Sequence, residues 1–114
     1  MPQRNLPYLR HMLDAVARIG RYLEGVDLEG FEADEVLQDA VIRQLGILGE
    51  AASRVDQEYR GSTPQIPWSK VISTRNRLIH GYLSVDIEIV FRTATHHVPR
   101  LRPSLVQAVG DLDR

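Results

Sequence analysis

The sequence predicts an all-α fold, an antiparallel four-helix bundle that leaves room for a short fifth helix at its C-terminal end. Two observations predict it. Apolar residues recur at three- and four-residue spacing over long stretches, which is the pattern of amphipathic helices. No stretch shows the alternation of apolar and polar residues that marks a half-buried strand. A chain of 114 residues can bury one helical core, so we expect a single domain over residues 1–114.

The first two helices are expected over residues 6–24 and about 33–59. Asn5 is a candidate N-cap for the first helix and Asp34 for the second. Gly46 and Gly49 lower the helix propensity of the second segment but would permit a close helix crossing. The buried side of the first helix is marked by Leu9, Met12, Leu13, Val16, Ile19 and Leu23. The buried side of the second is marked by Val36, Leu37, Ala40, Val41, Gln44, Leu45, Leu48, Ala51, Ala52, Val55 and Tyr59.

The third helix follows a loop of turn-forming residues at positions 61–67 and is expected to end at about His80. Gly81 stands where a left-handed C-terminal cap is expected. A fourth helix should begin near Asp86, after which Pro99 and Pro103 predict a break, a kink or a new helix. The side chains of the third helix that should face the core are Trp68, Val71, Ile72 and Ile79.

Charge restricts the classes of function. The net charge of −1 argues against a protein that coats nucleic acid non-specifically. Its distribution is uneven: residues 24–39 hold seven acidic and no basic side chains, whereas residues 67–102 hold six basic side chains and two acidic ones. The basic stretch is compatible with RNA binding, but two solvated faces of opposite sign are an equally good interpretation.

Composition also bears on location. With no cysteine, disulfides and thiolate metal sites are excluded. No stretch approaches 18 apolar residues, and the N-terminal residues lack the apolar core of a signal peptide. We therefore expect a cytoplasmic protein with no membrane partner.

Polar groups that could carry chemistry gather at the end of the third expected helix. They are Arg75, His80 and Tyr82, with Asn76 and Arg77 beside them. Histidine transfers protons near neutral pH, and arginine presents a planar, charged fork that matches phosphate oxygens. Together they suffice for metal-free RNA cleavage, in which one group moves a proton and the cation stabilises the transition state. Alternatively, the helix dipole favours a histidine in a last turn, and an exposed arginine is usually solvated.

The spacing of Arg75 and His80 favours a dimer. Five residues correspond to about 140° around an ideal helix. The two side chains therefore do not project from one face unless the helix ends or bends between them. A two-fold homodimer would place two copies of the motif across a shared cleft.

Other candidates are weaker. His96 and His97 are neighbours on a helix, point in different directions and lack nearby carboxylates, so we expect no metal site. His11 stands alone. The sequence has neither a glycine-rich phosphate loop nor a Gly-Ser nucleotidyltransferase signature. We expect neither a metal nor another cofactor.

Residues 66–82 (IPWSKVISTRNRLIHGY) closely resemble the signature segment of HepT-like proteins, which belong to the HEPN superfamily. The resemblance includes residues 8–15, 38–45, 49–52 and 85–90, and it covers roughly residues 8–105. It implies a HEPN-like helical homodimer in which two Arg-x4–6-His motifs meet at the interface. It also implies a metal-independent endoribonuclease toxin that cleaves tRNA or mRNA. Arg75 and His80 would be catalytic, and Asn76 and Arg77 would support them or bind RNA.

The resemblance further implies a partner. HepT is encoded beside MntA, a minimal nucleotidyltransferase antitoxin that transfers AMP to the tyrosine of an Arg-x4-His-x-Tyr motif. Arg75, His80 and Tyr82 match that motif residue by residue, which makes Tyr82 the expected AMP acceptor. The antitoxin would be a separate protein.

Two other functions stay open. A non-catalytic HEPN dimer would bind nucleotide or RNA, or would partner a nucleotidyltransferase, without cleaving anything. The second alternative is a helical dimer with a purely structural role. The presence of both Arg75 and His80 favours the ribonuclease, because a binding module needs no proton-transfer group. A structural dimer would leave Asn76, His80 and Tyr82 unexplained.

Overall fold

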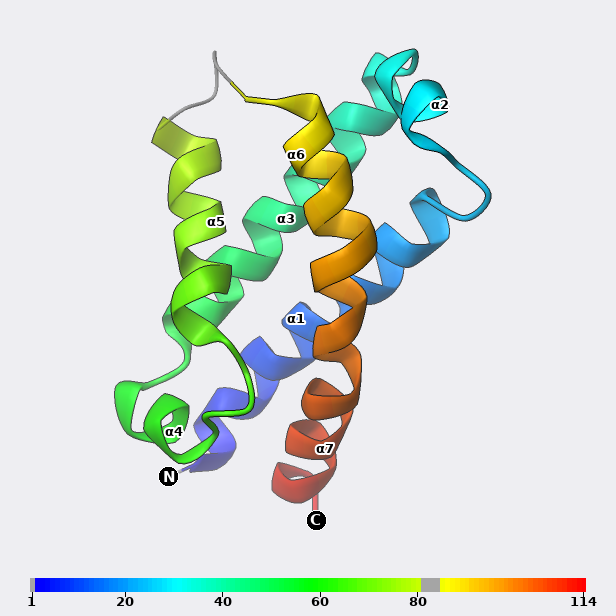
Figure 1. Ribbon diagram of the computed structural model, residues 1–114. Coiled ribbons are helices and arrows are strands. Elements are labelled where there is room, and N and C mark those ends of the chain that lie inside the picture. Colours follow the sequence, from blue (N-terminus) through cyan, green and yellow to red (C-terminus); the bar gives the residue numbers. More distant parts are fainter. Residues whose placement is uncertain (1, 81–84) are drawn as a thin grey trace.

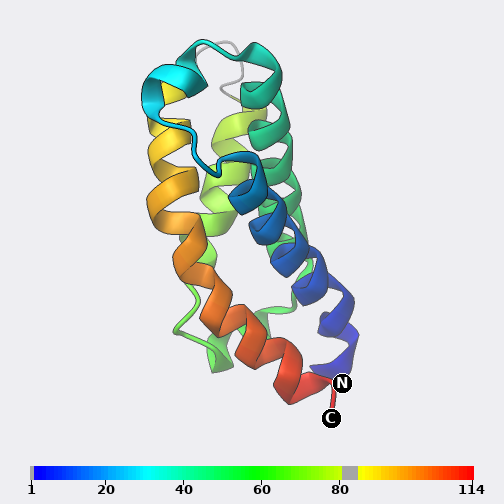
Figure 2. The same cartoon turned by 90° about the vertical axis from the view of Figure 1, so that its right-hand side faces the viewer.

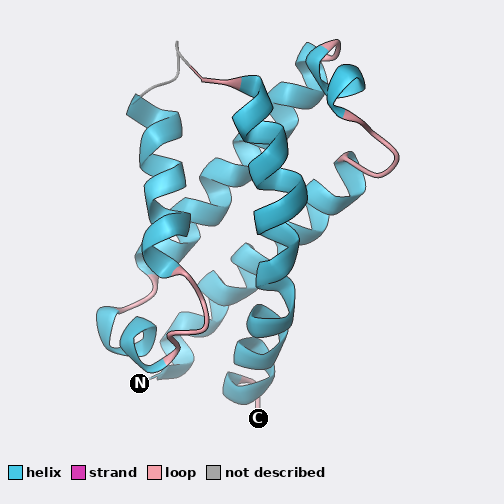
Figure 3. Ribbon diagram, viewed as in Figure 1, coloured by secondary structure: helices cyan, strands magenta, loops and turns pink. Residues whose placement is uncertain are grey.

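The computed structural model describes residues 2–80 and 85–114, with all their side chains except those of Ile79 and His80. Within these ranges every regular element is a helix (Figure 3), which confirms the all-α class. None of the described helices is long and apolar enough to cross a membrane. The elements are η1 (Pro2–Asn5), α1 (Leu6–Tyr22), α2 (Leu28–Glu32), α3 (Glu35–Arg54), α4 (Gln57–Ser62), α5 (Trp68–His80), α6 (Ile87–Arg92), η3 (Thr93–His97), η4 (Val98–Leu101) and α7 (Arg102–Leu112).

The helices α1, α3 and α5 and the run from α6 to α7 alternate in direction along the chain (Figure 1). The central rod, α3, packs against both α1 and α5, and α1 also packs against α7. The fourth rod is the helical run from α6 through η3 and η4 to α7. The predicted antiparallel four-helix bundle is confirmed, and the expected fifth segment, α7, continues the fourth rod.

The core extends through the bundle and fixes how the rods cross. Burying a large apolar side chain contributes about 1.5–3 kcal/mol each. One expected core position was wrong, because Val36 is 80% exposed. It precedes Leu37 by one residue, about 100° around the helix, and Leu37 is the residue that packs against the core. The largest fully buried apolar side chains are Phe31, Leu9, Met12, Ile19, Ile66, Leu105, Val41 and Val55.

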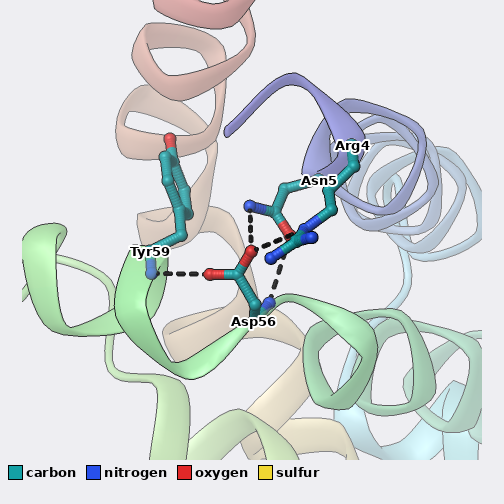
Figure 4. A network of polar contacts seen from close by, with 4 residues as sticks. All are labelled: Arg4, Asn5, Asp56 and Tyr59. Atoms are coloured by element: carbon teal, nitrogen blue, oxygen red, sulfur yellow. Dashed lines mark hydrogen bonds and ion pairs between the residues drawn. The ribbon is translucent and has the colours of Figure 1, made fainter. Parts of the chain in front are cut away.

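A polar corner at Asp56 ends α3 and begins α4 (Figure 4). The Oδ1 atom of Asp56 accepts a hydrogen bond from the backbone N–H of Tyr59 at 2.8 Å and thereby caps α4. Its Oδ2 atom accepts from Asn5 Nδ2 at 3.1 Å and from Arg4 Nε at 3.2 Å. The predicted single helix over residues 33–59 is therefore wrong: Asp34 caps α3 as expected, but α3 ends at Arg54.

Asn5 joins this corner to the start of α1, where it occupies the predicted N-cap position without capping the helix through its side chain. It is instead buried, and its Oδ1 atom accepts a hydrogen bond from the backbone N–H of Asp56 at 3.1 Å. The pKa of Asp56 is lowered, first by the bond from Tyr59, then by the bond from Asn5 and by Arg4.

The helix α2 lies between the first two helices expected from the sequence, where no helix was predicted. Asp27 caps this helix by accepting a hydrogen bond from the backbone N–H of Gly30 at 2.8 Å. The ring of Phe31 then lies 5.3 Å from the ring of Phe91, centroid to centroid, and attaches α2 to α6.

The fourth rod begins as predicted, with Asp86 capping α6 through the backbone N–H groups of Glu88 and Ile89. Pro99 and Pro103 do not break this rod, but a new helix, α7, begins there with Pro103 in its first turn, which is one of the predicted outcomes. The chain passes through a π-helical turn, η3, and a 3-10 turn, η4, before α7. Proline has no backbone N–H to donate within a helix, and such changes of helical pitch accommodate the missing hydrogen bonds.

The two ends of the chain lie at the same end of the bundle (Figure 2). An ion pair of 2.8 Å joins Arg10 Nη2 of α1 to Asp113 Oδ2, which follows α7. The C-terminal end of α5 lies at the opposite end of the molecule.

Candidate functional site

Arg75 emerges from α5 where this helix lies against α3. The contact depends on Gly49, because a Cβ atom at that position would overlap the Cβ of Arg75 and approach the carbonyl oxygen of Val71 to 3.1 Å. The close helix crossing that the glycines of α3 would permit therefore occurs at Gly49. Gly46 plays no part in it, since a Cβ there would meet nothing within 4 Å.

The guanidinium of Arg75 is held from two sides. Its Nη2 atom forms an ion pair with Glu50 Oε2 at 2.8 Å, and its Nη1 donates to Asn76 Oδ1 at 2.9 Å. Its Nε is buried and has no hydrogen-bond partner among the described residues. About 30% of the Arg75 side chain stays exposed. The cation is thus fixed in direction while part of it still faces solvent, as binding of an external anion requires.

Glu50 also binds a second arginine. Its Oε1 atom accepts a hydrogen bond from Arg54 Nε at 3.2 Å. One carboxylate therefore stands between two guanidinium groups, those of Arg54 and Arg75, and neutralises only part of their charge.

The predicted polar residues around Arg75 are only partly brought together. Asn76 contacts Arg75 directly. Arg77 is exposed and forms no ion pair with any described carboxylate. Positions 75 and 77 lie about 200° apart around a helix, so Arg77 stands on a different side of α5 from Arg75.

His80 and Tyr82 are less fully placed. The backbone of α5 continues through His80 without a break, so positions 75 and 80 keep the helical separation of about 140°. The side chain of His80, the whole of Tyr82 and the predicted cap at Gly81 lie outside the described residues.

An open groove of about 540 Å³ lies beside Arg75 between α1, α3 and α5. We call it the basic groove; its polar and aromatic lining is Tyr8, His11, Arg43, Glu50, Arg54 and Arg75. His11 is therefore not isolated in space, although nothing near it in the sequence indicates a partner. In the described part of the chain, no three histidine, aspartate or glutamate side chains come close enough to hold a metal ion.

Comparison with known proteins identifies the family. Residues 12–108 match the sequence profile described as Ribonuclease HepT-like. The chain belongs to the HepT-like ribonuclease family. It is similar to the "Probable ribonuclease HepT" of Thermococcus cleftensis, with 31% identity over 102 residues that cover 90% of this chain and 93% of that protein. It is also similar to the "Putative RNase TTE0752" of Caldanaerobacter subterraneus subsp. tengcongensis. That match has 34% identity over 95 residues, 83% of this chain and 85% of the other.

A third relative matches along almost the full length. The "Putative RNase MJ0125" of Methanocaldococcus jannaschii is 30% identical over 114 residues, which cover 99% of this chain and 98% of that protein. No solved structure matches the chain significantly. These similarities make the HepT-like chain a ribonuclease-type protein of HEPN architecture, as its sequence predicted.

Two residues beside Arg75 in this HepT-like protein had no role assigned from the sequence. The sequence indicates Gly49 only as a helix-packing residue and Glu50 only as part of the family resemblance. A charged residue next to a helical glycine is a weak signal. The ion pair joins Glu50 and Arg75, which are 25 positions apart in the chain and lie on different helices, so only the tertiary structure brings them together.

Proposed function

We propose that this HepT-like chain is a metal-independent endoribonuclease, the toxin of a toxin–antitoxin pair of the HepT/MntA type. The observation that carries the proposal is the fixed guanidinium of Arg75. The guanidinium forms an ion pair with Glu50, and the side chain of Arg75 packs against Gly49. Arg75 lies five positions before His80 on the same helix. Membership of a ribonuclease family supports the same chemistry.

The proposed reaction needs a proton-transfer group and a cation. The ribose 2′-oxygen attacks phosphorus and loses its proton, a new P–O2′ bond forms, and the P–O5′ bond breaks as the 5′-oxygen takes up a proton. The products are a 2′,3′-cyclic phosphate and a 5′-hydroxyl. In this scheme His80 moves one of these protons, and Arg75 stabilises the additional negative charge on the phosphate oxygens. Asn76 keeps the guanidinium oriented, and Arg77 binds a neighbouring RNA phosphate.

We further propose that the active unit is a homodimer acting on tRNA or mRNA in the cytoplasm. The separation of positions 75 and 80 around α5 supports a site that is completed across a two-fold axis. We assign Tyr82 as the residue through which an MntA-like nucleotidyltransferase silences the enzyme. Its hydroxyl oxygen would attack the α-phosphate of ATP, so that an O–P bond forms and pyrophosphate leaves. The attached AMP would compete with RNA for Arg75.

The test is cleavage of labelled RNA in the presence of a chelator, with analysis of the product ends. Wild type should leave a cyclic phosphate or its hydrolysis product, and Arg75→Ala and His80→Ala should each reduce the rate about 10²-fold or more. Circular dichroism should show unchanged helical content in both variants. Light scattering should give a dimer at micromolar concentration. Normal cleavage by both variants would exclude this site, and RNA binding without cleavage by wild type would favour the non-catalytic binding module.

A further inference from the structure

The basic groove carries more positive charge than the structure balances. Three arginines line it, against the single carboxylate of Glu50, which is already bonded to Arg54 and Arg75. Arg43 is exposed and has no described carboxylate within the 4 Å that defines an ion pair. The groove therefore fits an anionic ligand.

The shape of the groove indicates that this anion is extended. Arg43 and Arg54 lie eleven residues apart on α3, which returns them to the same side of the helix about 16 Å apart along its axis. Arg75 approaches from α5 near the Arg54 end, through the shared contact with Glu50. A single phosphate could not reach both Arg43 and Arg54, whereas a polyanion with regularly spaced charges would contact both ends of the groove.

Tyr8 adds a surface for a nucleobase. It packs partly against the core and also lines the groove, together with the small residues Gly46 and Ala51. Aromatic rings beside a row of cations are how proteins bind single-stranded nucleic acid, because each base presents a face that can stack.

We propose that the basic groove binds the single-stranded RNA segment adjacent to the scissile phosphodiester, with Arg43 and Arg54 on phosphates and Tyr8 against a base. The inference rests on the proposed ribonuclease function, since Arg75 connects the groove to the proposed catalytic pair. A second copy of the chain is a poorer occupant. A two-fold axis near Arg43 would bring like charges together, which opposes association, whereas the axis of the proposed dimer lies at the Arg75 end of the groove.

The binding test uses a fluorescent single-stranded RNA with 2′-O-methyl riboses, which cannot be cleaved because the nucleophile is blocked. Arg43→Ala should weaken binding about five- to tenfold and reduce the salt dependence by about one ion. Tyr8→Leu should weaken binding while leaving the salt dependence unchanged. Arg21→Ala is the matched control, because Arg21 is also exposed on a helix and has no described carboxylate within 4 Å. Equal affinities for Arg43→Ala and Arg21→Ala would overturn the proposal.

Cleavage kinetics separate this inference from the proposed function. Arg43→Ala should raise KM more than it lowers kcat, whereas His80→Ala should lower kcat. If Arg43→Ala had unchanged kinetics while His80→Ala was inactive, RNA binding in the groove would be refuted and the ribonuclease function would still hold. No cleavage by wild type, with binding still dependent on Arg43, would refute the ribonuclease and support the groove. If Arg43→Ala instead changed the sedimentation coefficient with RNA affinity unaltered, the groove would be an interface between copies and the proposal would fail.

Discussion

Gly49 and Arg75 share one space: the volume that a Cβ atom of residue 49 would fill is occupied by the Cβ of Arg75. The absence of a side chain at position 49 of α3 thus sets how closely α5 can approach α3. It also sets where the guanidinium of Arg75 meets Glu50, the neighbour of Gly49 in the chain. Helix packing and the position of the proposed phosphate-binding group therefore depend on the same atom pair.

Gly49→Ala should reduce both stability and cleavage. The new methyl group must push α5 away from α3, and overpacking of this kind costs about 1–3 kcal/mol. Because Arg75 moves with α5, kcat should fall even at temperatures where the variant is fully folded. Gly20→Ala is the matched control, since Gly20 also lies within a helix and a Cβ there meets nothing within 4 Å. It should raise the free energy of unfolding by about 0.5–1 kcal/mol. Chemical denaturation and cleavage rates check both; a gain in stability for Gly49→Ala would contradict the packing.

Glu50→Gln should leave Arg75 charged but poorly positioned. We expect kcat to fall about tenfold while KM does not rise, because the variant also removes a negative charge from beside the RNA. Replacing a carboxylate by a neutral amide outside the site should leave kcat unchanged. Glu88→Gln provides that comparison, since Glu88 pairs with Arg92 at 2.9 Å on an exposed part of α6. Steady-state kinetics on a short RNA distinguish the two. A rise in KM with kcat intact would mean that Glu50 contributes to binding and not to orientation.

Asp56→Asn should destabilise the fold in a pH-dependent way. The amide keeps an acceptor for the N–H of Tyr59 but loses the carboxylate that accepts from Asn5 and Arg4. Loss of these bonds should lower the Tm by about 4–8 °C at pH 7. The lowered pKa of Asp56 means that its stabilising contribution is complete above the ordinary carboxyl pKa of about 3.9 and is lost as pH falls through the folded-state pKa.

The difference in Tm between wild type and Asp56→Asn should therefore stay constant from pH 7 to 5 and shrink below about pH 4. Thermal melts across this range give the measurement. Asp14→Asn is the control, because Asp14 forms only an exposed ion pair with Arg18, and its effect on Tm should be close to zero. A difference for Asp56→Asn that persisted undiminished into acid would show that the carboxylate charge is not the stabilising element.

Tyr82→Phe should cleave RNA but escape silencing. The variant keeps the ring and loses the oxygen that would accept AMP. After incubation with ATP and the cognate nucleotidyltransferase, intact mass should show one or more adenylyl groups on wild type and none on the variant. Tyr22→Phe should be labelled like wild type. Equal labelling of Tyr82→Phe and wild type would place the modification elsewhere.

Much of the fold could be predicted because it follows from local patterning. The apolar repeat from Leu9 to Leu23 determines α1, and the caps at Asp34 and Asp86 mark where α3 and the fourth rod begin. Asp56 escaped prediction because the residues around it continue the apolar spacing of the preceding helix. Its role depends on Asn5, 51 residues earlier, which satisfies the carboxylate only in the folded chain.

The candidate site, too, has residues that the sequence predicts and residues that only the tertiary structure brings together. Arg75 could be predicted from its residue type and its spacing to His80. Its neighbour Asn76 could also be predicted, whereas Glu50 and Gly49 lie on another helix and the sequence offers no spacing that connects them to Arg75. His11 and Arg43 are 32 residues apart and share a groove only because α1 and α3 run side by side.

The ion pair between Arg10 and Asp113 has a use for protein engineering. Since the pair marks where the two ends of the chain lie close together, a short linker could close the backbone into a ring, with new ends cut at the loop before Pro67. Two copies of the chain could likewise be fused in tandem. A tag or surface anchor attached at either end would extend away from the C-terminal end of α5. The molecule could therefore be immobilised with the region around His80 facing the solution.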